Sequence, residues 1–162
     1  MDRAPRRLRL GCAGRGEVTV VQWQSTRYGY VVKLDPGEEI VESLHAFAVA
    51  RGIRAGALSG IGAAGPCELG YFIPGTHEYV RREFPDEYEI GSLTGNWSEF
   101  DGEPFPHCHV VLGGDDFVAY TGHLFRGIVT VTCEIHVITD PAIVHRTRRP
   151  DLGFNPLDLP NE

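Results

Sequence analysis

The alternating run between residues 128 and 139 (IVTVTCEIHVIT) limits the fold of this chain more than any other feature. β-Branched residues dominate it, and successive side chains of a β-strand point to opposite faces. One face of the run carries Val129, Val131, Cys133, Ile135 and Val137, while the other includes Thr130, Thr132, Glu134 and His136. This pattern and its length predict a long strand near the centre of a sheet.

The rest of the chain supplies further strands and one helix. Runs that are typical of strands occupy residues 18–23, 27–34, 67–73, 77–83 and 88–96, and residues 97–106 are expected to form a polar connector. The glycine-rich segment 54–64 precedes another apolar run rather than a helix, so it predicts a bent strand and not a phosphate-binding loop.

The clearest helix is expected at about residues 36–51. Asp35 is a good N-cap, Pro36 suits the first helical position, and Glu38 stands where a capping-box partner belongs. Apolar residues then recur at helical spacing, and Gly52 follows as a C-cap. Together with the strands, this helix indicates an α+β fold with a mostly antiparallel sheet.

The length of the chain indicates one domain, and its cysteines indicate a reducing compartment. The chain has 162 residues and a net charge of -7, which does not favour a domain-wide nucleic-acid interface. None of its four cysteines forms a C-x-x-C pair, and no apolar run is long enough to span a membrane. We expect a domain at residues 17–140 in the cytoplasm, a disordered arginine-rich arm at 1–16, and an extended tail at 141–162 that packs along the surface or against another subunit.

A histidine pattern gives the candidate site. His107 and His109 are two positions apart in an apolar run, so they project from the same face of a strand. His123 follows one predicted hairpin later and can reach them if residues 117–123 pair back. Three imidazoles with one free position are the ligand set of an open zinc site. Gly113 and Gly114 stand where a cupin would need a glutamate ligand, which excludes a cupin-type site.

Several segments in fixed order resemble a known family, the PPC (plants and prokaryotes conserved) domain. They are residues 34–39 (LDPGEE), 59–63 (SGIGA), 69–72 (LGYF), 89–95 (EIGSLTG), 101–102 (DG), 106–112 (PHCHVVL), 122–124 (GHL) and 133–135 (CEI). The resemblance implies a sandwich-like domain that assembles as a homotrimer, with His107, His109 and His123 as metal ligands. The family's plant members act on A·T-rich DNA through AT-hooks, and this chain has no AT-hook because Glu17 follows Gly14-Arg15-Gly16.

These observations leave more than one function open. The leading hypothesis is a zinc-binding homotrimer of unassigned cellular role. A role as a DNA-associated regulator falls within this hypothesis, and no membrane partner is expected. The alternative is a zinc-dependent hydrolase, or a small-ligand-binding protein, that uses the open coordination position of the metal. A hydrolase would use zinc to lower the pKa of a bound water to about 7, and it would also need a general acid or base. Glu103 and Glu134 are candidates for that role by residue type only.

Overall fold

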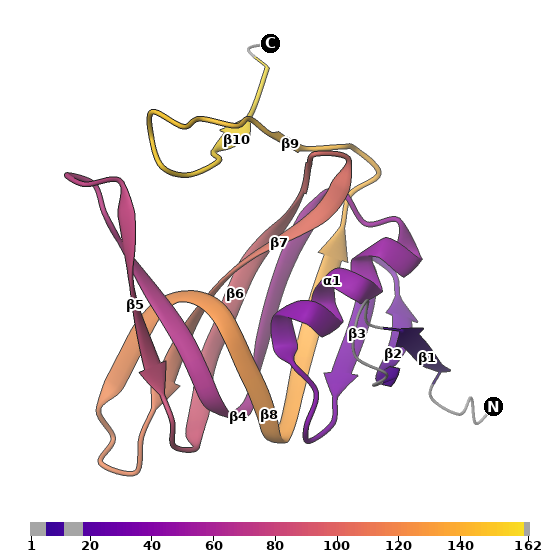
Figure 1. Cartoon of the computed structure of the whole chain (residues 1–162). Helices are drawn as coiled ribbons and strands as arrows, with labels where there is room; N and C mark the ends of the chain where they lie inside the picture. Colours follow the sequence, from indigo (N-terminus) through magenta and orange to yellow (C-terminus); the bar gives the residue numbers. More distant parts are fainter. Residues whose placement is uncertain (1–5, 12–17, 161–162) are drawn as a thin grey trace.

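The computed structural model describes residues 6–11 and 18–160, which form one curved sheet and one helix (Figure 1). The helix α1 spans Ile40–Arg51. The strands are β1 Arg6–Gly11, β2 Val18–Thr26, β3 Gly29–Leu34, β4 Gly56–Ile73, β5 Glu78–Phe84, β6 Tyr88–Phe100, β7 Glu103–Gly113, β8 Ala119–Thr139, β9 His145–Arg146 and β10 Leu157–Asp158. Strand pairing is antiparallel except between β6 and β9, so the expected α+β class with a mostly antiparallel sheet is confirmed.

Strand β8 occupies the centre of the sheet, as its alternation predicts. It pairs with β3, β4 and β7, and it begins at Ala119, well before the predicted strand. Strand β4 pairs along most of β8 through several register shifts, which confirms the expected bent strand in place of a phosphate loop. Because β4 also pairs with β6, and β6 with β7, the strands β4, β6, β7 and β8 form a closed circuit of pairing.

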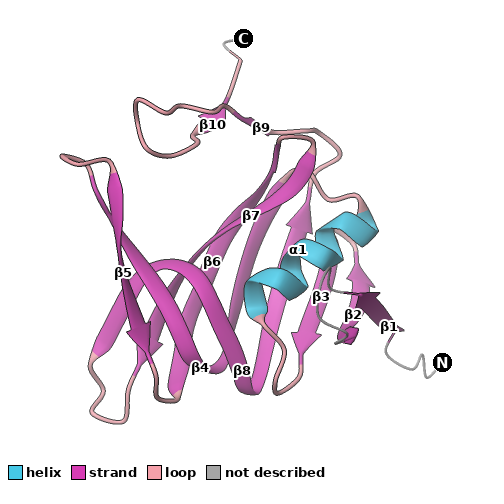
Figure 2. Ribbon diagram, viewed as in Figure 1, coloured by secondary structure: helices cyan, strands magenta, loops and turns pink. Residues whose placement is uncertain are grey.

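Helix α1 lies across one face of the sheet, as Figure 2 shows. Its side chains Ile40, Leu44 and Phe47 are fully buried, and the ring of Phe47 packs edge-on against Tyr30 of β3 at 5.3 Å between centroids. This helix, which is the only one among the described residues, is not long and apolar enough to cross a membrane.

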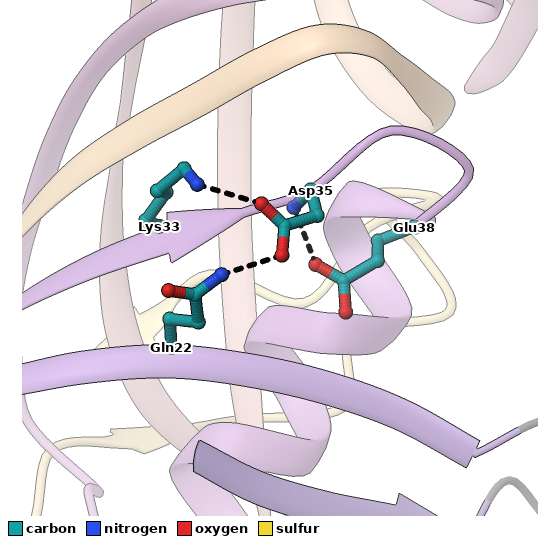
Figure 3. A network of polar contacts seen from close by, with 4 residues as sticks. All are labelled: Gln22, Lys33, Asp35 and Glu38. Carbon is teal, nitrogen blue, oxygen red and sulfur yellow. Dashed lines mark hydrogen bonds and ion pairs between the residues drawn. The ribbon is translucent and has the colours of Figure 1, made fainter. Parts of the chain in front are cut away.

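The start of α1 differs from the prediction. The N-cap is Glu39, whose side chain accepts a hydrogen bond from the Glu42 amide, and the helix begins at Ile40 rather than near residue 36. Asp35 does not cap the helix, because its carboxylate accepts hydrogen bonds from the side chains of Gln22 and Lys33 (Figure 3). The C-cap is confirmed, since Gly52 adopts the left-handed conformation with φ of 65°.

The predicted connector at residues 97–106 is wrong. Strand β6 continues to Phe100 and β7 starts at Glu103, so only Asp101 and Gly102 lie between them. Their φ values are 52° and 85°, which is the left-handed geometry of a two-residue hairpin turn. Asp-Gly is a strong hairpin signal, and it outweighs the prolines at positions 104 and 106.

The two ends of the chain contain more strand than the sequence indicates. Residues 6–11, which were expected within a disordered arm, form β1 and pair with β2 from Arg6 opposite Trp23 to Gly11 opposite Val18. The rest of that arm lies outside the described residues. The C-terminal tail is extended as predicted, and it forms β9 and β10, which pair with each other.

Candidate metal centre

The candidate site lies on the hairpin formed by β7 and β8. His107 and His109 flank the buried Cys108 on β7, so the pleat directs both imidazoles to the face opposite the core. His109 pairs directly with His123 of β8. The sequence-based prediction that His123 lies one hairpin away from the other two histidines is therefore confirmed in register.

The three imidazoles converge. One nitrogen from each of His107, His109 and His123 lies within 4.8 Å of the others, and the ring centroids are 5.0 to 5.5 Å apart. Nitrogens bound to one tetrahedral zinc at about 2.1 Å are about 3.4 Å apart. Small side-chain rotations would therefore bring the cluster to ligand distances.

His123 is the most enclosed donor of the three. Its ring packs 4.6 Å from the ring of Phe125 and 5.6 Å from that of Tyr79, between centroids. Its Nδ1 is buried and has no hydrogen-bond partner among residues 6–11 and 18–160. A buried polar atom left without a partner is costly, so this nitrogen is suited to a ligand that supplies one.

The backbone beside His123 is packed too closely for a larger residue. A Cβ atom added to Gly122 would lie 2.8 Å from the carbonyl oxygen of Gly70 on β4. Glycine at position 122 thus allows β4 and β8 to approach each other closely next to His123.

The cluster favours neutral imidazoles. Burial, together with Arg146 and His109, lowers the pKa of His107 to about 4. Burial is also the largest cause for His123, whose pKa is likewise lowered to about 4, with further contributions from the other two histidines and two arginines. At neutral pH both rings are therefore uncharged, which is the form of imidazole that binds metal.

Arg146 of the tail borders the cluster. Its Nη2 lies 3.3 Å from Nδ1 of His107 and donates to Asn96 Oδ1 at 2.9 Å. Its Nε donates to Ser98 Oγ at 2.8 Å, and its Nη1 donates to the carbonyl oxygen of Asn155 at 2.7 Å. Arg146 belongs to the predicted tail at residues 141–162, and no local sequence pattern could reveal its position beside a strand from a distant part of the chain.

The tail is docked over this end of the sheet. Glu99 of β6 forms ion pairs with Arg54 and with His145 of β9, and Arg148 pairs with Asp101 at the β6–β7 turn. Further along, Phe154 packs on Phe72 of β4 at 5.3 Å between ring centroids. Figure 1 shows the tail crossing beyond the turn that joins β6 and β7. Within one chain, the tail therefore packs along the surface of the domain.

No carboxylate belongs to the cluster among residues 6–11 and 18–160. Glu103 lies opposite Phe100 beside the β6–β7 turn, and Glu134 is exposed opposite Lys33 of β3. Neither of these candidates for general acid or base is brought to the histidines. The donor set therefore fits a borderline metal such as zinc, which prefers imidazole, better than magnesium or calcium, which prefer oxygen ligands.

The fold and the cluster define an α+β domain with a three-histidine candidate metal centre. The profile of the Plants and Prokaryotes Conserved (PCC) domain matches residues 24–140 of this chain. The chain therefore belongs to that family, as its motifs indicate. A search of curated proteins finds no match.

Solved structures of similar fold carry two kinds of description. A proposed DNA-binding protein from Bacteroides thetaiotaomicron is 35% identical with a TM-score of 0.82, over 85% of this chain and 96% of that one. A plant- and prokaryote-conserved (PPC) protein from Pyrococcus horikoshii is 30% identical with a TM-score of 0.77, over 86% and 96% of the two chains. A metal-containing protein from Archaeoglobus fulgidus is 34% identical with a TM-score of 0.74, over 84% and 96%.

Proposed function

We propose that this protein binds one zinc ion through His107, His109 and His123. The observation that carries the proposal is the convergence of three imidazole nitrogens, one from each histidine, within 4.8 Å of one another. The description of the Archaeoglobus fulgidus neighbour as metal-containing supports it. Three protein ligands leave a fourth position open for a further ligand.

Elemental analysis tests the metal directly. The protein purified with zinc present should contain about one zinc per chain, as expected for a single site. The His107→Ala/His109→Ala variant should contain almost none. The matched control is His45→Ala/His136→Ala, which removes two exposed histidines far from the cluster in the chain. Equal zinc contents in the wild type and the His107→Ala/His109→Ala variant would contradict the proposal.

We also propose that the domain assembles as a homotrimer, as the family resemblance implies. The support in this chain is apolar surface on the face of the sheet that α1 leaves uncovered. Ile61 of β4 and Ile138 of β8 alternate with buried residues, and they are 61% and 57% exposed. Exposed apolar surface indicates a contact with another chain when it is contiguous, which the trimer requires of this face.

Light scattering coupled to gel filtration measures the assembly. The wild type should elute with about three times the mass of one chain, in line with closed cyclic symmetry. The Ile61→Glu/Ile138→Glu variant should shift to a smaller species, while Val49→Glu on the helix surface serves as the control. A wild type that is monomeric at all concentrations would refute the trimer.

DNA association is a second candidate, supported by the description of the Bacteroides thetaiotaomicron neighbour. The arginines at positions 6, 7 and 9 on β1 offer local positive charge in a chain of net charge -7. Gel shift with duplex DNA at two salt concentrations tests it, because phosphate contacts weaken steeply as salt rises. Binding should be weakened when these three arginines are changed to glutamine. Absence of a shift at low salt would remove this candidate.

A cytoplasmic location completes the proposal. Cys67, Cys108 and Cys133 are buried free thiols, and burial raises the pKa of each. Inert, unpaired thiols are usual in a reducing compartment. Fractionation of cells that produce the tagged protein would test the location.

A further inference from the structure

Arg146 is fixed beside the histidine cluster by acceptors that belong to the scaffold. Asn96 and Ser98 on β6 and the Asn155 carbonyl of the tail each accept one of its N–H groups, at 2.7 to 2.9 Å. The guanidinium also lies 5.0 Å above the ring of Phe105. A side chain anchored in this way keeps its charge at the cluster, whatever happens to its remaining contact.

That remaining contact is with a proposed metal ligand. A guanidinium has only donors, so the 3.3 Å approach of Arg146 Nη2 to His107 Nδ1 is a hydrogen bond in which the imidazole accepts. A neutral imidazole has one nitrogen lone pair in the ring plane, and its other nitrogen carries a proton. The lone pair of His107 therefore serves either Arg146 or a metal, but not both.

Metal binding thus leaves one N–H of Arg146 without its acceptor. If His107 binds the metal through Nδ1, the metal takes the lone pair that accepts from Arg146. If it binds through Nε2, Nδ1 carries the proton and can no longer accept from Arg146. In both cases the freed N–H group stays anchored beside the ring of His107, at the edge of the cluster. The acceptor that best suits a guanidinium is an anionic oxygen.

The charges around the cluster favour the same kind of ligand. The charged side chains that act on His123 are Arg81 and Arg146, and Arg146 also acts on His107. The described part of the cluster contains no carboxylate to neutralise them. A divalent metal would add further positive charge, so an anion is the complement of this site.

We propose that the open position of the three-histidine site takes a small ligand with an oxyanion group, a carboxylate or a phosphate, and that Arg146 donates a hydrogen bond to it. This inference rests on the proposed metal function and names the ligand class of the same site. It makes Arg146 a specificity-determining residue and gives the C-terminal tail a part in ligand binding.

Cobalt substitution makes the site visible. The protein is stripped of metal, loaded with Co²⁺, and titrated with acetate or inorganic phosphate at constant ionic strength, while the visible absorption of the metal is followed. Both anions should change the spectrum saturably in the wild type. Arg146→Met, which keeps an unbranched apolar stem and removes the guanidinium, should weaken anion binding about tenfold or more, as expected for a lost charge-assisted hydrogen bond.

The control variant is Arg148→Met. It removes the same charge from the same tail, but Arg148 is exposed and pairs with Asp101, so anion binding should change less than about twofold.

The affinity for Co²⁺ gives a second measurement, which should change in the opposite direction to the anion affinity. Arg146→Met should bind Co²⁺ about twofold to tenfold more tightly, because His107 loses a competing hydrogen bond.

The possible failures are distinguishable. A wild type that does not bind Co²⁺ would refute the metal function and this inference together. Normal Co²⁺ binding with equal anion affinity in the wild type and Arg146→Met would overturn the inference alone. A loss of both Co²⁺ and anion affinity in Arg146→Met would also overturn it, since Arg146 would then be needed only for the structure. Equal losses in Arg146→Met and Arg148→Met would point to bulk charge and contradict a specific contact.

Discussion

Two half-buried polar clusters stand at different ends of this fold, and they differ in how completely their atoms are paired. At the start of α1, the Asp35 carboxylate accepts from Gln22 and Lys33, and the Asp35 amide donates to Glu38 at 2.7 Å (Figure 3). In the histidine cluster, Nδ1 of His123 has no partner. These hydrogen bonds of the first cluster join its own groups, whereas the second leaves a buried nitrogen of His123 unpartnered among the described residues.

The comparison shows how polar groups that support the fold differ from those prepared for a ligand. A paired network contributes to stability in the folded chain alone, because its groups regain the hydrogen bonds they lose to water. An unpaired cluster costs free energy until a ligand enters. Each cluster should therefore respond to a different perturbation.

The largest expected effect is stabilisation by zinc. At a free zinc concentration of about 100 times Kd, the free energy of unfolding should rise by about 2.7 kcal/mol. His109→Ala should abolish most of this gain. Because the side chain of His109 is exposed, misfolding of the variant would not explain the loss. Urea unfolding with and without zinc measures both, and Asp35→Asn should retain the full gain. An equal gain in the free energy of unfolding with zinc in His109→Ala would contradict the view that the histidine cluster is prepared for a ligand.

Next in size is the loss of the Asp35 network. Asp35→Ala should lower the free energy of unfolding by about 1–2 kcal/mol, since two part-buried hydrogen bonds to the carboxylate disappear. Lys33→Met is the matched control and should cost only about 0.5 kcal/mol, because the side chains of that ion pair are 44% and 40% exposed and water weakens their attraction. Chemical denaturation in the absence of metal gives these values. An Asp35→Ala variant as stable as the wild type would show that this cluster is not structural.

A smaller effect of opposite sign is expected for His123→Leu without metal. The change removes a buried nitrogen that has no partner, so the metal-free protein should gain about 0.5–1 kcal/mol. The same variant should lose the response to zinc. A clear loss of stability without metal would mean that His123 supports the fold, as Asp35 does.

A dependence on pH is also expected for the metal-free protein, because burial disfavours the charged form of both rings. The pKa values of His107 and His123 in the folded protein are about 4, below the ordinary value of 6.5. Between pH 4 and pH 6.5 the unfolded chain therefore binds more protons than the folded protein. The stability of the metal-free protein should therefore fall as the pH is lowered from 6.5 to 4. The His107→Gln/His123→Leu variant should show a flatter profile between these pH values.

Glu39 at the helix start should act in the opposite direction. Burial raises its pKa above 4.5, although hydrogen bonds from the amides of Glu42 and Gly127 oppose that shift. The folded state then binds more protons than the unfolded chain, so this residue's contribution falls as the pH rises above 4.5. Comparing Glu39→Gln with the wild type over the same pH series separates the two contributions.

The histidine cluster was largely predictable because its geometry is local. Two residues two positions apart share a strand face, and a hairpin brings the next strand into register. The C-cap at Gly52 was predictable for a similar reason, since glycine suits a left-handed residue. The N-cap was not, because Asp35 is a good cap by type, and only contacts with Gln22 and Lys33 take its oxygens away.

The sequence by itself determined the α+β class, the central strand, the family and the three histidines, because periodicity and turn chemistry act over a few residues. Only the tertiary structure decided that β1 joins the sheet and that Arg146 lies against His107, whereas the Asp101-Gly102 pair is itself a local signal for the hairpin at residues 97–106. The contact between Arg146 and His107 joins residues 39 positions apart, and nothing in the local pattern encodes which distant partner a side chain will meet. The ligand class proposed for the site depends on this contact.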